Sequence, residues 1–389
     1  MTLKAARRGA IPPFLVMEVM RAAAMRDAAK GDVIHLEVGQ PSTAAPAPVI
    51  AAARRALEAD VLGYTDALGV AGLREAIAGH YARRYDVHLP VERIVVTMGA
   101  SGAFILAFLA AFDPGDRVAL ALPAYPAYRH TVAALGLEAV PLPTGPETRF
   151  QPTPALLDAL DPPVEGLIVA SPSNPAGTML APDELAGLAR HCAERGIRLI
   201  SDEIYHGITF GREAATAAAF EAGAVVVNSF SKYFSMTGWR LGWMVVPDDL
   251  ARSVECLTQN LFISPSALSQ AAALAAFDCE PELAANVARY GRNRALLLDA
   301  LPGLGLDRLA PADGAFYIYA DVAHLTGDSP TFCRQMLAET GIAATPGVDF
   351  DPERGHRYVR FSFAGATEDM AEAVRRLRQW PRLEPREER

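Results

Sequence analysis

The feature that most limits the possible folds is an alternation of strand-like and helix-like stretches between about residues 94 and 232. Short apolar runs at 94–97, 117–122, 167–170, 197–200 and 225–227 are typical of buried strands. Strands that alternate with helices form an α/β domain with a mainly parallel sheet, and ligands bind beyond the carboxyl ends of its strands. The sequence therefore predicts an α/β fold with a binding site at one edge of a sheet.

The last of these strands leads into the most unusual polar segment of the chain. Val225–Val227 precedes Ser229, Ser231 and Lys232, and Arg240 follows. A lysine that leaves a buried strand beside another cation is poorly hydrated, so its pKa is lowered and its amine becomes nucleophilic. The two hydroxyls and the guanidinium suit a phosphate dianion. The pattern indicates a covalent anchor for pyridoxal phosphate, although a lysine after a strand is also a common solvated loop residue.

Small residues and tyrosines follow two other strands. Ala100 and Ser101 lie where the strand at 94–97 meets a helix predicted over 103–112, and uncovered amides at a helix N-terminus bind anions. Tight packing of a helix on a strand also favours small residues, so both explanations stay open. Tyr125 and Tyr128 follow the strand at 117–122, where they either stack on a flat ring or cover the core.

Two more strand ends carry an amide and a carboxylate. Asn174 lies between Pro172 and Pro175, which restrict the backbone around it, although Asn-Pro is also a turn signal. Asp202 follows the strand at 197–200, and a buried carboxylate there needs a cationic partner. A protonated pyridine nitrogen and a structural arginine are both suitable. Because all these side chains follow strand ends, we expect them to share one site.

The length of 389 residues favours two domains. We expect an N-terminal arm that joins the smaller domain over residues 1–45, a large cofactor-binding domain over 46–285 and a small α+β domain over 286–389. Gly39 follows a strand predicted over 33–38, in a turn where backbone can approach a ligand. Arg360 lies within a strand predicted over 358–363, and an inward-facing arginine there needs a carboxylate. The pattern leaves its orientation open.

Composition excludes several classes of protein. The net charge is −9 and the pI is near 5.5, so the chain lacks the excess of cations that nucleic acids or anionic membranes attract. The longest apolar run, at 103–112, is too short to cross a bilayer. The N-terminus lacks the features of a secretory signal. The cysteines do not have the spacing of a zinc site or a disulfide framework. We expect a cytoplasmic protein without a metal.

In combination, the motifs of the chain resemble those of the class I and II aminotransferases, pyridoxal-phosphate enzymes of the aspartate aminotransferase family. The likeness runs from residue 39 to residue 360, and the motifs occur in the order found in the family. In chain order they are Asn-Pro-x-Gly, Asp-Glu-x-Tyr, Ser-Phe-Ser-Lys with Gly-Trp-Arg after it, and a late Arg-Phe-Ser. The resemblance implies the type I fold of pyridoxal-phosphate-dependent transferases. In that fold a large domain with a mainly parallel, seven-stranded sheet is joined to a smaller α+β domain. It also implies a homodimer with shared active sites.

The resemblance further implies a role for each matching residue. Lys232 would hold pyridoxal 5′-phosphate covalently and carry a proton during the reaction. Asp202 would pair with the pyridine nitrogen, Tyr205 and Asn174 with the phenolic oxygen of the ring, and Tyr125 with the ring face. The implied phosphate ligands are Ala100, Ser101, Ser229, Ser231, Arg240 and the partner subunit's Tyr64. The substrate carboxylate would be held by Arg360, with help from Gly39 and Asn174.

The implied reaction moves an amino group from an L-α-amino acid to a 2-oxo acid by a ping-pong cycle. A carbon–sulfur β-lyase on the same fold is an alternative. A non-catalytic effector-binding module, of the kind found in some transcription regulators, is a less favoured one. Some dicarboxylate-specific members of the family have a basic residue where this chain has Ser101. We therefore expect substrates with neutral or aromatic side chains.

Overall fold

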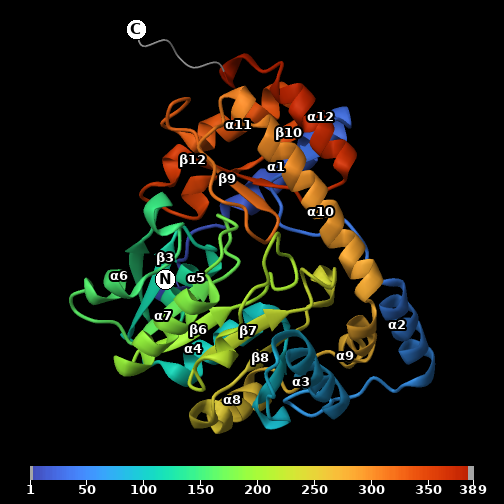
Figure 1. The fold of residues 1–389 in the computed structure, drawn as a ribbon. Coiled ribbons are helices and arrows are strands. Elements are labelled where there is room, and N and C mark those ends of the chain that lie inside the picture. The colour runs from blue at the N-terminus through green and yellow to red at the C-terminus, as the bar shows by residue number, and fades with distance from the viewer. Residues whose placement is uncertain (1–2, 384–389) are drawn as a thin grey trace.

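The structure, a computed structural model, describes residues 3–383 and contains a large central sheet (Figure 1). Its seven strands are β2 (Ile94–Thr97), β3 (Arg117–Leu122), β4 (Glu138–Pro143), β5 (Gly166–Ala170), β6 (Arg198–Asp202), β7 (Val225–Ser229) and β8 (Gly242–Val245). They are ordered β2-β8-β7-β6-β5-β3-β4. Only β8 runs antiparallel to its neighbours, and the other pairs are parallel. The predicted α/β fold with a mainly parallel sheet is confirmed.

Helices cover both faces of this sheet because its strands are apolar on both faces. In β7, Val225 and Val227 pack into one core and Val226 into the other. Consecutive β-branched residues are typical of strands buried in this way. The first core contains residues of α4 (Gly99–Ala111), α5 (Ala127–Ala134) and α8 (Asp248–Leu261). The second contains residues of α2 (Ala47–Ala59), α3 (Ala71–Tyr85), α6 (Pro154–Asp158), α7 (Pro182–Glu194) and α9 (Ala267–Ala273).

A smaller group of elements lies above the large sheet in the view of Figure 1. It contains a three-stranded antiparallel sheet in the order β11-β12-β9 and a parallel pair of short strands, β1 and β10. The strands are β1 (Ile34–His35), β9 (Tyr317–Asp321), β10 (Ile342–Ala343), β11 (Thr345–Pro346) and β12 (Tyr358–Ser362). The helices are α1 (Leu15–Lys30), α10 (Glu280–Ala300), α11 (Ser329–Thr340) and α12 (Thr367–Leu377).

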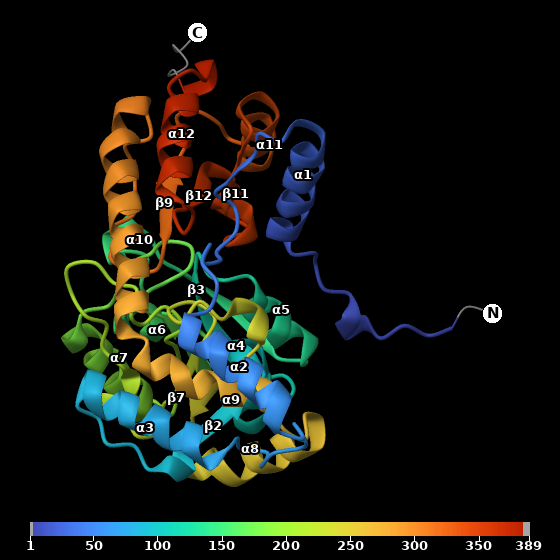
Figure 2. The same cartoon turned by 90° about the vertical axis from the view of Figure 1, so that its right-hand side faces the viewer.

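The β1–β10 pair shows that the beginning of the chain joins its C-terminal part. Ile34 pairs with Ile342, and α1 lies beside α11 in Figure 2. The long helix α10 extends from the smaller group down to the helices of the large sheet in the same view. The division into an N-terminal arm, a large domain and a small C-terminal domain stays a prediction. The boundaries at 45/46 and 285/286 stay predictions.

Two predicted elements differ from those observed. The strand expected over 33–38 pairs only at Ile34 and His35. The helix expected over 103–112 begins at Gly99, so Ala100 and Ser101 lie in its first turn and not in a loop before it. Before β8, which begins at Gly242, the chain forms a short 3-10 helix at Thr237–Trp239.

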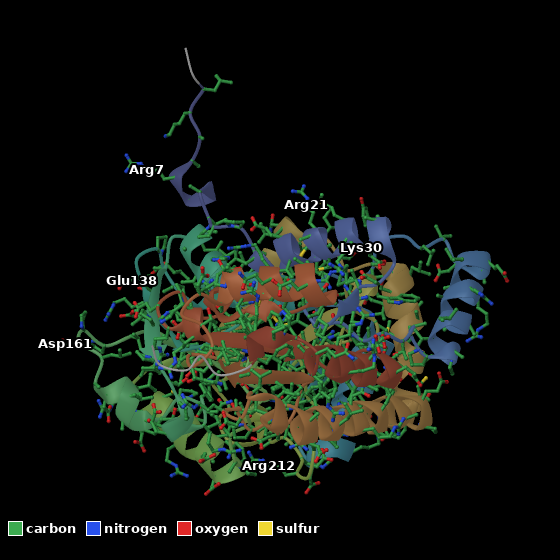
Figure 3. All side chains as sticks on the ribbon, turned by 90° about the horizontal axis from the view of Figure 1, so that it is seen from above. Arg7, Arg21, Lys30, Glu138, Asp161 and Arg212 are labelled. Carbon is green, nitrogen blue, oxygen red and sulfur yellow. The ribbon has the colours of Figure 1, made fainter. Side chains whose placement is uncertain are left out.

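Exposed charged side chains lie on α1 and on the arm before it, as the view from above shows (Figure 3). Arg21 of α1 points away from the body of the protein, Lys30 at the end of the helix is exposed, and Arg7 lies on an arm that extends from the body. Within residues 3–383, the structure contains no helix with the length and hydropathy needed to cross a membrane.

Candidate active site

The predicted side chains gather around a cavity of about 420 Å³ between the carboxyl ends of the large sheet and the smaller group of elements. Of the thirteen residues named as candidates from sequence, eleven line it: Gly39, Ala100, Ser101, Tyr125, Asn174, Asp202, Tyr205, Ser231, Lys232, Arg240 and Arg360. Ser229 and Tyr64 do not. The fold thus brings together residues that are up to about 320 positions apart in sequence, as expected for the strand ends of a parallel sheet.

Lys232 is partly buried in the cavity and has an unusual environment for an amine. Its Nζ donates a hydrogen bond to the carbonyl oxygen of Gly39 at 2.6 Å. Burial, followed by the positive charges of Arg360 and Arg240, lowers the pKa of Lys232 to about 8. A larger share of the side chain is therefore neutral near pH 7 than for a solvated lysine, and only the neutral amine is a nucleophile.

Asp202 is the last residue of β6, and its buried carboxylate has neutral partners. Its Oδ1 accepts a hydrogen bond from the Ile204 amide at 3.0 Å, and its Oδ2 accepts one from the Tyr128 hydroxyl. Burial raises the pKa of Asp202 to about 6. Among the described residues no lysine or arginine forms an ion pair with it, so the structural salt bridge considered above is not found. The carboxylate is available to a cationic ligand.

Tyr128 is a site residue whose partner the sequence did not reveal. The motif Pro-Ala-Tyr-Pro-Ala-Tyr marks two tyrosines at a strand end, but not which of them reaches Asp202. In the structure Tyr125 and Tyr128 pack edge to face at 5.4 Å, and Tyr128 is the one that donates to Asp202. Its hydrogen bond favours the ionised carboxylate and so opposes the effect of burial on the pKa of Asp202.

The first turn of α4 and Arg240 form a cradle for an anion. Gly99 begins the helix with φ +71°, and a Cβ there would lie 2.7 Å from Nη2 of Arg240. The guanidinium is thus close to the positive end of the helix dipole. Ser231 lines the same part of the cavity, and its hydroxyl is 2.8 Å from that of Ser229, which is buried beneath it. Ser229 is placed to orient Ser231 and is not itself exposed in the cavity.

Arg360 faces inward, which settles the orientation that the strand pattern left open. It is buried, and its Nη1 donates to Oδ1 of Asn174 at 2.8 Å, while Nη2 donates to Thr345 and to the carbonyl oxygen of Glu37. The guanidinium lies 4.4 Å from the ring centre of Tyr317. Within residues 3–383 no carboxylate pairs with Arg360, and its Nε has no hydrogen-bond partner. Arg360 therefore lines the cavity with neutral hydrogen-bond partners and without a carboxylate, so its charge suits a ligand carboxylate.

Tyr205 and Gly39 are linked by a residue that sequence reasoning missed, Tyr317 of β9. The hydroxyls of Tyr205 and Tyr317 are 2.7 Å apart, and burial raises the pKa of Tyr205 well above its ordinary value. A Cβ at Gly39 would lie only 1.8 Å from the Tyr317 hydroxyl, so residue 39 must be glycine for this tyrosine to keep its place. Nothing in the sequence around Tyr317 marks it as a site residue, because it lies in an apolar strand.

Tyr64 lies apart from the other candidates. Its side chain is 85% exposed, in the segment between α2 and α3, and it does not line the cavity. In contrast, four apolar side chains at the start of the chain line the cavity without having been predicted to do so: Phe14, Val16, Met17 and Met20. They give the cavity an apolar wall formed by α1 and the residue before it.

The residues present fit pyridoxal 5′-phosphate in three respects. The cradle of Arg240, Ser231 and the first amides of α4 suits a phosphate dianion, and the buried Asp202 carboxylate lacks a cation that a protonated pyridine would supply. Lys232, with its lowered pKa, lies in the same cavity and is able to attack an aldehyde. Arg360 is left free for the carboxylate of an amino acid. The arrangement is that of a site for amine and carbonyl chemistry.

Comparison with known proteins supports this chemistry over the whole chain. Residues 31–377 match the family described as aminotransferase class I and II. The valine–pyruvate aminotransferase of Mycobacterium tuberculosis is 53% identical, with 98% of this chain and 99% of that protein covered. A crystal structure of an aminotransferase from the same organism has a TM-score of 0.96 over 97% of this chain and 99% of that one. Aspartate aminotransferase from Thermus thermophilus with maleate has a TM-score of 0.91 at 31% identity, over 97% and 100% of the chains.

Proposed function

We propose that this chain, which belongs to the class I and II aminotransferases and is a transaminase, binds pyridoxal 5′-phosphate at Lys232 and acts on neutral amino acids. The observation that carries the proposal is the convergence of Lys232, Asp202 and Arg360 on one cavity with an apolar wall. Enzymes of this family generally use this cofactor. Because the chain is a transaminase, neither a carbon–sulfur β-lyase nor a non-catalytic effector-binding module is supported as its main function.

Each residue of the site then has a task that follows from its surroundings. When bound, the cofactor withdraws electrons from the α-carbon of the substrate, so that the proton on this carbon becomes acidic. Lys232 accepts that proton and returns it, which its lowered pKa allows near neutral pH. Asp202 holds a positive charge on the ring nitrogen. Arg360 binds the substrate carboxylate and fixes the α-carbon near Lys232.

The apolar wall supports a substrate with an uncharged side chain. Lys232, Arg240 and Arg360 are the cations among the described residues that line the cavity, and each already has a task. Ser101 supplies no charge for a second carboxylate. Phe14, Val16 and Phe104 instead suit an aliphatic or aromatic side chain. The relative from Mycobacterium tuberculosis is named for valine and pyruvate, and we propose a branched aliphatic amino acid as donor and a small 2-oxo acid as acceptor.

A panel of amino acids in the half-reaction tests this proposal. We expect L-valine and L-alanine to convert the bound cofactor to its amine form, which is measured by the change in absorbance. Their kcat/KM values should be at least about tenfold higher than those of L-aspartate and L-glutamate, because an unpaired carboxylate is costly in an apolar pocket. Formation of the amine form separates transamination from β-elimination, because β-elimination also yields a 2-oxo acid but releases ammonia and leaves the cofactor in its aldehyde form. Exclusive reaction with aspartate and glutamate would show that another cation enters the pocket.

We also propose that the active unit is a homodimer in the cytoplasm and that Tyr64 completes the partner's site. Tyr64 follows two exposed apolar side chains, Leu57 and Val61. The amide of the next residue, Thr65, donates a hydrogen bond to the Ser264 hydroxyl at 3.3 Å. An exposed apolar surface of this kind is typical of an interface. The cytoplasmic location rests on cysteines that are unpaired in the described residues.

Mixing an inactive variant with a weakened one tests whether the sites are shared. Lys232→Ala and Tyr64→Ala chains, mixed under conditions of subunit exchange, are expected to form heterodimers with one doubly damaged site and one wild-type site. Activity should therefore rise above the sum of the parents, in proportion to the heterodimer fraction measured by native mass spectrometry. If Tyr64 serves its own chain, each heterodimer site keeps one lesion, and no activity is recovered although heterodimers are present.

A further inference from the structure

The N-terminal half of α1 forms one wall of the active-site cavity. Val16, Met17 and Met20 line the cavity together with Phe14, the residue before the helix. The ring of Phe14 packs edge to face on that of Tyr125, with 5.6 Å between ring centres. The position of this half of the helix therefore affects the shape of the space that a substrate side chain can occupy.

This half of α1 has no local cap at its start. Phe14 occupies the N-cap position and offers no side-chain acceptor. The acceptor comes instead from Asp349, far away in the sequence. Its Oδ1 accepts from the Leu15 amide at 3.1 Å and its Oδ2 from the Val16 amide at 3.2 Å. A carboxylate at this place also interacts favourably with the helix dipole, so Asp349 satisfies the free amides that the helix cannot satisfy itself.

The segment around Asp349 also contacts the part of the site that holds the substrate carboxylate. The ring of Phe350 lies 4.6 Å from the guanidinium carbon of Arg360, on which the carboxylate is proposed to bind. The carbonyl oxygen of Asp349 accepts from Nη2 of Arg129 in α5 at 2.6 Å, and that of Phe350 accepts from the Ala124 amide at 3.1 Å. Asp349 therefore holds α1 from a segment that is itself fixed against Arg360 and the large sheet.

The C-terminal half of α1 is attached independently. Ala23 packs in a small core with Leu337 and Ala343, and Nη1 of Arg26 donates to the carbonyl oxygen of Ala338 at 2.7 Å. Apart from Val16 and Ala23, the described residues of the helix are not fully buried. Loss of the Asp349 contacts would thus loosen the half of α1 that lines the cavity while the other half stays in place.

We propose that Asp349 is a positioning residue that fixes the N-terminal half of α1 against the cavity and so sets the preference for branched aliphatic over smaller amino acids. This inference rests on the proposed function, since it concerns how the same site selects its substrate. A fixed apolar wall contacts the branched side chain of valine and so favours its binding, whereas binding of alanine, with its single methyl group, does not depend on this contact.

The test compares Asp349→Ala and Asp349→Asn with the wild type in the half-reaction with L-valine and L-alanine. We expect Asp349→Ala to lower kcat/KM for L-valine about tenfold and for L-alanine less than about twofold. Asp349→Asn keeps one acceptor oxygen, so its kcat/KM for L-valine should lie between those of the wild type and of Asp349→Ala. Asp328→Ala is the matched control, because Asp328 accepts from the Thr331 amide at the start of α11, which does not line the cavity. It should leave the valine-to-alanine ratio unchanged.

Limited digestion with trypsin gives a readout that does not depend on substrate. Arg21 lies exposed on α1, and cleavage after it should be faster in Asp349→Ala than in the wild type or in Asp328→Ala. Unchanged cleavage would overturn the role of Asp349. If the wild type prefers valine to alanine and Asp349→Ala shows the same preference, that result would also overturn it. A wild type that prefers aspartate to valine would overturn the proposed substrate class instead, and trypsin would still decide whether Asp349 holds α1.

Discussion

Replacement of Lys232 by alanine is expected to abolish transamination while the protein stays folded. The side chain is proposed to be both the covalent attachment point and the acceptor of the substrate proton, and proton transfer by a positioned group alone contributes about 10²–10⁴-fold to a rate. We therefore expect the half-reaction with L-valine to slow by at least about 10³-fold. Lys232→Arg should be equally inactive, because arginine stays protonated and cannot act as nucleophile or base.

Chemical labelling gives this prediction a second measurement. Borohydride reduction of the purified protein should attach the cofactor permanently to the peptide that contains Lys232. The sequence has only two other lysines, Lys4 and Lys30, and both are exposed. Lys30→Ala is thus a control that should keep full activity and labelling. Label on Lys4 or Lys30, or a Lys232→Ala protein with near-normal turnover, would contradict the assignment.

The large sheet was predictable because its signals are local. Val225–Val227 is a consecutive run of β-branched residues, and it forms a strand with side chains in both cores. Asp202, Ser229 and Lys232 lie at or after the ends of buried strands, and parallel strands place these ends at the same edge. Strand order was not needed to expect that they converge. Residue type and position along the chain were sufficient.

The elements that sequence did not predict are those whose signals are weak or remote. β4 contains Pro141 and Pro143, which argue against a strand, and they are tolerated because β4 is at the edge of the sheet. The strand predicted over 33–38 is present only as the two-residue β1, because its pairing depends on Ile342 and Ala343 of β10, a strand of two residues with no pattern of its own. Such pairing is fixed by the tertiary structure and not by local propensity.

The same distinction applies to the site. Arg360 is flanked by buried residues on β12, so alternation along the strand could not tell which way it faces; the orientation follows from Asn174 and Thr345, which come from other parts of the fold. The Asp349 cap of α1 joins residues more than 330 positions apart. A sequence pattern can report that Phe14 is a poor N-cap, but not which distant carboxylate replaces it.

Replacement of Asp202 by asparagine is expected to leave the cofactor bound but to slow the half-reaction by about 10³-fold. The phosphate cradle of Arg240 and Ser231 does not involve Asp202, so affinity should persist. The amide cannot hold a positive charge on the ring nitrogen, and loss of one such electrostatic contact in a buried site costs about 3–4 kcal/mol of transition-state stabilisation. Single-turnover rates with L-valine, at saturating cofactor, measure this loss.

The neighbouring Glu203 separates the electronic role of Asp202 from the loss of any buried carboxylate. Glu203 is equally buried, does not line the cavity, and has its pKa raised to about 8 by burial. Because this acid is already mostly protonated at pH 7, Glu203→Gln should change the half-reaction rate less than about threefold. If Asp202→Asn is equally mild in a folded, cofactor-bound protein, Asp202 is a structural residue that accepts from Tyr128 and Ile204. A large loss in Asp202→Asn alone assigns it to the cofactor ring.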